Sequence, residues 1–125
     1  MIPKQDLRIG NSVMYKGEAW KVEELADTAA HISQHPLWVR GHYENLEPIP
    51  ITEEALVKMG WKEYTYTKRD EISISYERIF IHDNGFYFHP EKNSFVYGLK
   101  SIYINSIHSL QNAIYALTQT ELSYD

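Results

Sequence analysis

Apolar and polar residues alternate through the N-terminal third of the chain, with the period of two that is typical of half-buried β-strands. Lys16-Gly17 interrupts the alternation, and a glycine there supplies the positive φ that a tight hairpin turn needs. Pro36 ends a later run, because proline cannot donate a hydrogen bond to a strand ladder. This pattern predicts a small SH3-like half-barrel whose strands cover residues 12–15, 20–25, 29–33 and 37–40.

A stiff, proline-rich connector at 47–51 precedes the clearest helix signal in the chain. Thr52 has the side-chain oxygen that an N-cap requires. Glu53 and Glu54 follow in the first turn, where the helix dipole favours negative charge. Gly60 suits the left-handed residue that ends many helices. These residues predict a short helix directly after the connector.

After this helix the period of two returns, which predicts further strands. Ile79 and Ile81 have the opposite parity to Ile74, so a turn or bulge is expected at Glu77-Arg78. Asn84-Gly85 is typical of a type I′ hairpin turn, whose twist matches that of the flanking strands. Several short strands joined by such turns predict an antiparallel meander.

The C-terminal region predicts a helix over 106–118, because its apolar residues recur at helical spacing. The stripe is expected to cover one face of the meander and consists of Ile107, Leu110, Ile114 and Leu117. The sequence therefore predicts an α+β fold with more strand than helix. We expect one domain over 1–125, and any seam between subdomains should lie at 47–51.

Composition narrows the range of functions. The chain has 125 residues, 43% of them hydrophobic, which argues against wholesale disorder. It has no cysteine, which removes disulfides, thiolate zinc sites and cysteine nucleophiles. The formal net charge of -5 disfavours duplex DNA as a partner. No apolar run approaches the ~20 residues of a membrane helix, and no signal peptide is evident, so a cytoplasmic protein is expected.

Aromatic side chains interleaved with cations are the main candidates for binding. Aromatic residues make up 14% of the chain, and tyrosine alone accounts for ten residues. Such groups can stack a base and hold a phosphate, although the same rings also serve simply to pack a sheet. The first group consists of Trp38, Arg40, His42 and Tyr43, and the second of Tyr64, Tyr66, Lys68 and Arg69. Gln111 and Asn112 add a polar patch beside the helix stripe, either to bond a strand carbonyl or to contact a partner.

Evidence for catalysis in the sequence is weak. His31, His35 and His42 are spaced like zinc ligands, but Pro36 and the strand pattern argue against the helical geometry that such spacing needs. The chain has no P-loop, Rossmann glycine fingerprint, zincin motif or nucleophile elbow. We therefore expect no enzyme, no cofactor and no bound metal, and keep a metal-dependent enzyme as a minor alternative.

Three stretches carry a family resemblance that spans nearly the whole chain. They are Arg8-Ile9-Gly10-Asn11 with Gly17 downstream, Pro48-Ile49-Pro50-Ile51-Thr52-Glu53-Glu54 running to Gly60-Trp61, and His108-Ser109-Leu110-Gln111-Asn112 running to Ala116-Leu117-Thr118 and Glu121-Leu122. In that order they resemble a family of small proteins of Bacteroidota, their phages and their mobile elements. Gln119 departs from the family, which often has glycine there, and this puts a left-handed helix end in doubt. The resemblance implies an origin and brings no catalytic or binding residue with it.

These observations favour a non-catalytic binding module. A phage or mobile-element origin suggests a host protein as the partner, and a host defence complex would make the chain an anti-defence protein such as an anti-CRISPR. An acidic protein would suit a basic, nucleic-acid-binding surface on that partner. The alternative is a protein that binds or sequesters a nucleotide or cyclic nucleotide through an aromatic pocket with one or two cations. The oligomeric state does not follow from the sequence.

Overall fold

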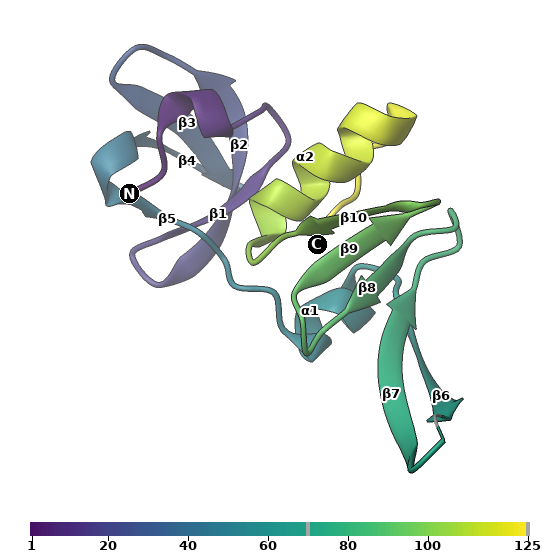
Figure 1. Ribbon diagram of the computed structural model, residues 1–125. Helices are drawn as coiled ribbons and strands as arrows, with labels where there is room; N and C mark the ends of the chain where they lie inside the picture. The colour runs from purple at the N-terminus through teal and green to yellow at the C-terminus, as the bar shows by residue number, and fades with distance from the viewer. Residues whose placement is uncertain (70, 125) are drawn as a thin grey trace. The chain divides into compact units, whose positions relative to one another are not determined.

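The computed structural model describes residues 1–69 and 71–124 and has an α+β fold, as predicted (Figure 1). The chain divides into two compact units. The first contains residues 1–51 and 105–124, and the second contains residues 52–104. Each unit has one five-stranded antiparallel sheet and one α-helix within the described residues. The boundary follows Ile51, at the end of the proline-rich connector.

The sheet of the first unit has the strand order β4-β3-β2-β1-β5, which fits the predicted SH3-like half-barrel. Lys16 and Gly17 join the first two strands with φ values of 51° and 80°, as a type I′ turn requires. The predicted hairpin is therefore confirmed. The elements of the unit are η1 (Lys4–Asp6), β1 (Ser12–Tyr15), β2 (Glu18–Leu25), β3 (Ala29–Gln34), β4 (Leu37–His42), η2 (Tyr43–Asn45), β5 (Leu46–Glu47) and α2 (Ile107–Thr118).

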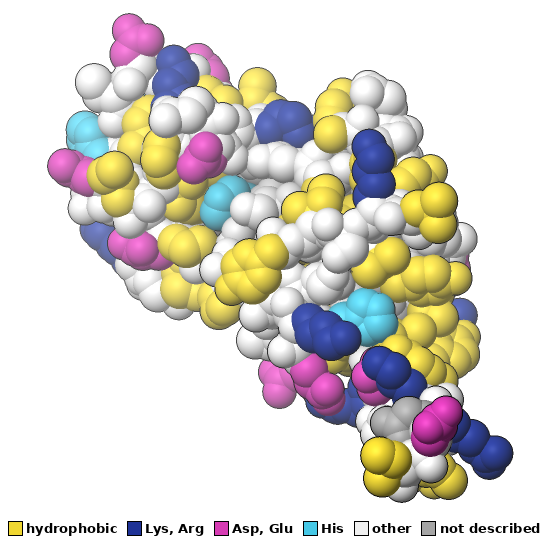
Figure 2. Space-filling model, viewed as in Figure 1, with side chains coloured by type: hydrophobic (Ala, Val, Ile, Leu, Met, Phe, Trp, Pro, Cys, Tyr) yellow, Lys and Arg dark blue, Asp and Glu magenta, His cyan; other side chains and the backbone are white. Residues whose placement is uncertain are grey.

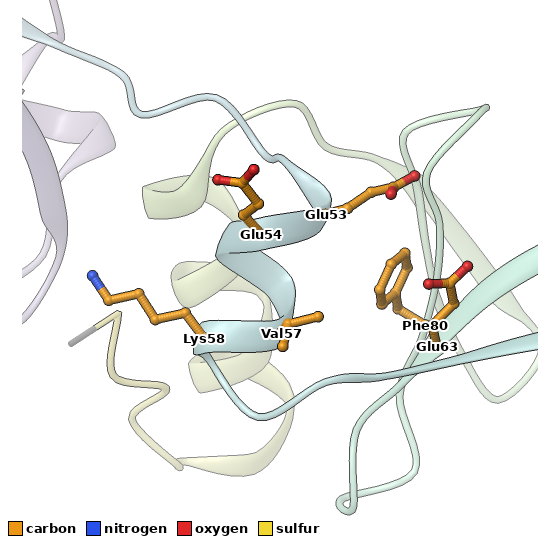
Figure 3. A pocket seen from close by; sticks show the side chains of 6 residues that line it. All are labelled: Glu53, Glu54, Val57, Lys58, Glu63 and Phe80. Carbon is orange, nitrogen blue, oxygen red and sulfur yellow. The ribbon is translucent and has the colours of Figure 1, made fainter.

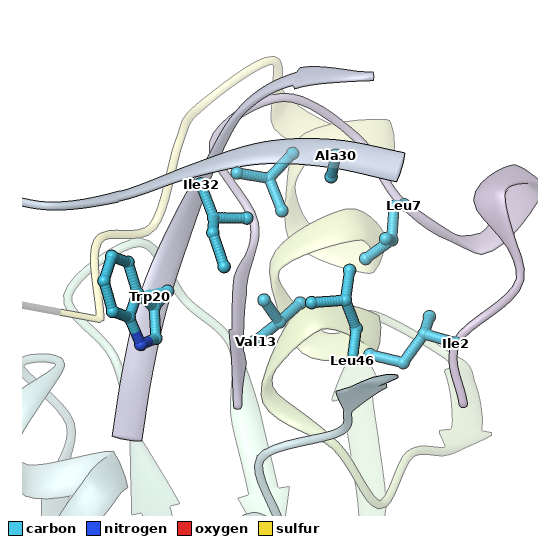
Figure 4. Packing of buried hydrophobic residues seen from close by; sticks show 8 residues of the cluster. Ile2, Leu7, Val13, Trp20, Ala30, Ile32 and Leu46 are labelled. Carbon is cyan, nitrogen blue, oxygen red and sulfur yellow. The ribbon is translucent and has the colours of Figure 1, made fainter. Parts of the chain in front are cut away.

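The core of the first unit lies on the inner side of this sheet. Alternate residues of the strands supply most of it, as the period of two requires. Figure 4 shows these side chains converging between the strands and the N-terminal segment. The buried cluster consists of Ile2, Leu7, Val13, Trp20, Val22, Ala30, Ile32 and Leu46.

Helix α2 belongs to the first unit by its contacts. Its first backbone amide, that of Ile107, donates to the carbonyl of Ile49 at 2.8 Å, and the helix contacts β1. The predicted C-terminal helix is therefore confirmed, and its contacts place it with the first unit. Periodicity identifies the buried side of a helix but does not say which sheet receives it.

The buried stripe of α2 differs from the predicted one at its end. Ile107, Leu110 and Ile114 are fully buried, but Leu117 is 42% exposed because it lies in the last turn. Gln111 occupies a buried position between Ile107 and Ile114 instead. The helix nevertheless ends in a left-handed residue. Gln119 adopts φ 60° and donates its amide to the carbonyl of Tyr115, so the absence of glycine does not remove this cap.

The second unit is the predicted antiparallel meander, with the strand order β10-β9-β8-β7-β6. Phe80, Phe88 and Phe95 are aligned in register on three neighbouring strands and are fully buried. Trp61 and Phe86 are buried in the same unit. Its elements are α1 (Glu53–Lys58), β6 (Lys62–Arg69), β7 (Ile74–Ile81), β8 (Tyr87–His89), β9 (Ser94–Tyr97) and β10 (Lys100–Tyr103).

Helix α1 has the two caps that the sequence predicts. The Thr52 hydroxyl oxygen accepts from the amide of Ala55 at 3.1 Å, which satisfies one free donor of the first turn. Gly60 has φ 95°, and the amides of Gly60 and Trp61 donate to the carbonyls of Val57 and Leu56. That pair of hydrogen bonds is the Schellman arrangement.

Two details of the meander contradict the predictions. Strand β7 is continuous, and its register with β6 runs without a shift through Glu77 and Arg78. The outer part of this two-stranded ribbon is exposed on both faces, so no core requires its apolar residues to share one parity. At Asp83-Asn84-Gly85 only Gly85 has a positive φ, and His82 pairs with Phe86. The turn is therefore a three-residue loop with a glycine bulge rather than a two-residue type I′ turn.

Candidate functional site

Strand β6 places three of the predicted binding residues on one face of the second sheet. Side chains alternate along a strand, so Tyr64, Tyr66 and Lys68 project from one face. Arg69 projects from the other face and is aligned with Ile74 of β7. The aromatic and basic group that the sequence predicts is therefore divided between the two faces.

The face that carries Tyr64 and Tyr66 continues across all five strands. The strand register places residues directly opposite one another, and opposite residues share a face. One cross-strand row contains Lys62, Ile81, Tyr87, Val96 and Ser101. The next contains His89, Ser94 and Tyr103. We call the apolar part of this surface the tyrosine face, and it consists of Tyr64, Tyr66, Ile79, Ile81, Tyr87, Val96 and Tyr103.

The tyrosines of this face are open to solvent. Tyr64 is 51% exposed, Tyr87 42% and Tyr103 68%, whereas the aliphatic side chains of the face are half-buried. Figure 2 shows hydrophobic side chains at the surface over this unit. An antiparallel sheet usually presents polar side chains on its open face. In the second sheet, the phenylalanines of one face are fully buried, and that face exposes only Tyr76 and Tyr97 among its tyrosines within the described residues. The opposite face exposes four tyrosines, Tyr64, Tyr66, Tyr87 and Tyr103.

A small polar cluster borders the tyrosine face on β6 and β7. The Tyr66 hydroxyl donates to Glu77, and Lys68 Nζ lies 3.6 Å from Glu77 Oε1. The hydrogen bond from Tyr66 lowers the pKa of Glu77, and Lys68 and Lys92 lower it further. The same hydrogen bond raises the pKa of Tyr66. At neutral pH the face therefore carries a carboxylate beside lysine, and its tyrosine hydroxyl stays protonated.

The first aromatic group lies on strand β4 of the first unit. Trp38, Arg40 and His42 alternate along the strand and share its outer face, and Trp38 is 62% exposed. His31 of β3 lies opposite Arg40, and these side chains border a hollow of about 230 Å³ with Trp38 and Val39. Arg40 donates to the Thr28 hydroxyl at 3.0 Å. The hollow is smaller than the roughly 300–1,000 Å³ of typical small-molecule sites.

Tyr43 does not join that group on the surface. It opens η2, packs against the core cluster of the first unit, and donates its hydroxyl to the carbonyl of Ala26. Burial raises the pKa of Tyr43, and Asp27 raises it further. This tyrosine covers the core, as the packing interpretation of the sequence expects.

Gln111 and Asn112 hold α2 against the N-terminal segment. Gln111 Oε1 accepts from the amide of Ser12 at 2.8 Å, and its Nε2 donates to the carbonyl of Leu122 at 2.9 Å. Asn112 accepts from the Asn11 side chain at 2.7 Å and donates to the carbonyl of Asp6 at 3.0 Å. The polar groups of both side chains are therefore used within the first unit.

The second unit has a pocket that the sequence does not predict (Figure 3). The pocket has a volume of about 430 Å³. Arg78 connects two of its carboxylates, because it contacts Glu53 and lies 3.4 Å from Glu63. These contacts raise the pKa of Arg78, chiefly through the hydrogen bond to Glu53. Its lining consists of Glu53, Glu54, Val57, Lys58, Glu63 and Phe80. No sequence motif could have indicated this pocket, since its lining residues come from helix α1 and from strands β6 and β7.

The described residues hold no group of three His, Cys, Asp or Glu side chains that could bind a metal ion, and this includes His31, His35 and His42. Within the same residues, no helix is long and apolar enough to cross a membrane. Comparison with protein-family models, with curated proteins and with solved structures finds no match. The candidate site therefore depends on the geometry of the chain itself.

Proposed function

We propose that this protein is a non-catalytic binding module that engages a protein partner through the tyrosine face. The observation that supports this is the cross-strand arrangement of exposed tyrosines on the open face of the second sheet. Tyrosine gives a large contact area with little loss of side-chain entropy, and it can also donate a hydrogen bond. Surfaces rich in tyrosine and poor in charge at their centre are typical of protein interfaces.

The form of the surface favours a macromolecule over a small ligand. Small molecules need a concavity that removes most of their surface from water, whereas a sheet face offers an extended area. Aliphatic side chains lie between the tyrosines and are half-buried, so a partner would complete their burial. Burial of this kind contributes roughly 25 cal/mol for each Å² of apolar surface removed from water.

The charge of the chain and its family resemblance indicate the kind of partner. A net charge of -5 favours association with a basic surface and disfavours a nucleic acid. The resemblance to small proteins of Bacteroidota, their phages and mobile elements supports a host protein in the cytoplasm as the partner. A host defence complex fits both properties, and the chain would then be an anti-defence protein such as an anti-CRISPR.

Two tyrosines on opposite faces of the same sheet provide the test. Tyr103 lies on the tyrosine face, and Tyr76 of β7 lies on the other face at 73% exposure. We expect the wild-type chain to capture a stoichiometric protein from host lysate, Tyr103→Ala to weaken the capture at least about tenfold, and Tyr76→Ala to leave it unchanged. Equal capture by both variants, or no stoichiometric partner for the wild type, would contradict the proposal.

A second candidate function is nucleotide binding at the hollow on β3 and β4. Trp38 offers a ring for stacking, and Arg40 offers a cation two residues along the same face. Thermal unfolding with saturating nucleotides or cyclic nucleotides tests it, because a bound ligand stabilises the folded state by mass action. An unfolding midpoint that rises for the wild type but not for Trp38→Ala would favour this function over the first.

A further inference from the structure

Strand β6 forms one edge of the second sheet. It pairs with β7 along all eight of its residues, and no described strand pairs with its other side. Every one of these residues is exposed. A long edge strand presents a row of unpaired backbone N–H and C=O groups, which is a template for another strand.

We propose that a second copy of this chain pairs with this edge, β6 against β6, to form a two-fold symmetric dimer. In such a dimer the strands run antiparallel and the two-fold axis is perpendicular to the sheet. Residues that face each other must then lie on the same face of the sheet, so only alternate registers are possible. The axis passes between the Tyr66 residues of the two copies.

Side-chain complementarity selects the register centred on Tyr66. There, Glu63 of each copy lies opposite Arg69 of the other, which gives two ion pairs related by the axis. Tyr64 lies opposite Lys68, which allows a cation–π contact. Thr65 lies opposite Thr67, a pair that hydrogen-bonds across strands. Each pair of facing residues in this register is therefore favourable.

The neighbouring registers lack this complementarity. Centring the strands on Thr65 places Lys62 opposite Lys68, and like charges directly opposite destabilise a sheet. Centring them on Thr67 places Arg69 opposite Thr65 and leaves no ion pair. Lysines on an edge discourage indiscriminate strand pairing. In the Tyr66 register, however, Lys68 meets an aromatic ring instead of another lysine.

The dimer would join two meanders into one continuous sheet. Because the axis is perpendicular to the sheet, the tyrosine faces of the two copies lie on the same side and adjoin at Tyr66. The dimer forms without any other molecule, so it can be tested on the purified protein and does not depend on the proposed partner.

Two charge-reversal variants, one at each end of the proposed ion pair, test the pairing. Arg69→Glu places carboxylates opposite each other twice in the dimer, and Glu63→Arg does the same with guanidinium groups. We expect size-exclusion chromatography with light scattering to give twice the chain mass for the wild type. Dimerisation should weaken by about tenfold or more for each variant alone. An equimolar mixture of the two should recover the dimer, because both ion pairs reform in the heterodimer.

A covalent trap keeps the test independent of those variants, since Glu63→Arg also affects the contact with Arg78. The chain has no cysteine, so Tyr66→Cys introduces the only thiol. Oxidation or a short bis-maleimide should link two Tyr66→Cys chains, and the matched Tyr76→Cys variant should stay unlinked. A wild-type chain that remains monomeric at every concentration reached overturns the proposal. A dimer that neither charge reversal nor Tyr66→Cys affects overturns it equally.

Discussion

His108 is the buried titratable side chain of α2. It is 7% exposed, and its Nδ1 has no hydrogen-bond partner within the described residues. Burial lowers the pKa of His108, and Asp6 opposes this shift only in part. An imidazole that the fold keeps neutral is a source of pH-dependent stability, because the unfolded chain accepts the proton first.

We predict that the protein loses stability as the pH falls below about 6.5, the ordinary pKa of histidine. Below that pH the unfolded state binds a proton at His108 that the folded state does not bind. Unfolding therefore takes up a proton, and its free energy falls as the pH falls. The contribution is fully present above the unfolded pKa and declines until the pH has passed the folded pKa. Urea unfolding at several pH values between about 7.5 and about 5 measures this decline in the free energy of unfolding.

The matched variants are His108→Gln and His35→Gln, the second at an exposed position in the turn between β3 and β4. We expect His108→Gln to flatten the decline of the free energy of unfolding with falling pH, and His35→Gln to keep the wild-type slope. The same slope in all three proteins would show that His108 is not the source.

At the residue scale, the same amino acid serves opposite purposes in the two units. Tyr43 packs against a core and uses its hydroxyl on a backbone carbonyl, whereas Tyr103 stands exposed on an open sheet face. Both tyrosines lie in or beside segments where apolar and polar residues alternate, so residue type and spacing do not distinguish the buried ring from the exposed one. The strand register and the burial of each ring decide which tyrosine can meet a partner.

At the scale of elements, α2 is held to the first unit by a buried polar contact as well as by its apolar stripe. The side-chain amide of Gln111 accepts a hydrogen bond from the backbone N–H of Ser12 on β1 and donates one to the backbone carbonyl of Leu122 in the tail. Buried backbone groups that lose their partners cost roughly 1–3 kcal/mol each. Gln111 therefore links three segments that lie far apart in the sequence.

We predict that Gln111→Ala lowers the free energy of unfolding by about 2–4 kcal/mol, because it leaves two buried backbone groups unsatisfied. The control is Gln5→Ala, at an exposed position of η1, which should change it by less than about 0.5 kcal/mol. Chemical denaturation measures both. A Gln111→Ala protein as stable as the control would mean that water replaces the side chain without cost.

The elements that the sequence predicted correctly are those with local causes. Lys16-Gly17 supplies its own turn geometry, and Thr52 with Gly60 caps α1 from within a few residues. The errors arose where distant residues decide. The continuity of β7 depends on its pairing with β6, and the burial of Gln111 on α2 depends on hydrogen bonds to β1 and the tail. The tyrosine face needs the register of five strands, which no spacing within one segment reveals.

At the scale of the whole molecule, the two units differ in which side chains they expose to a ligand or partner. The exposed aromatic residue of the first unit, Trp38, borders only a small hollow, and Gln111 and Asn112 are engaged within the fold. The second unit exposes a sheet face of tyrosine and aliphatic side chains and an unpaired edge at β6. The central claim is therefore that the tyrosine face is where a protein partner binds.

The most direct measurement is site-specific photo-crosslinking in host cells, with a benzophenone amino acid in place of Tyr103 or, as the control, Tyr76. Both positions are exposed and lie on opposite faces of the same sheet, so the comparison separates the faces. The tyrosine face as the binding site predicts one covalent adduct with a host protein from position 103 and none from position 76. An adduct from position 76 alone, equal adducts from both, or none from position 103 would contradict it.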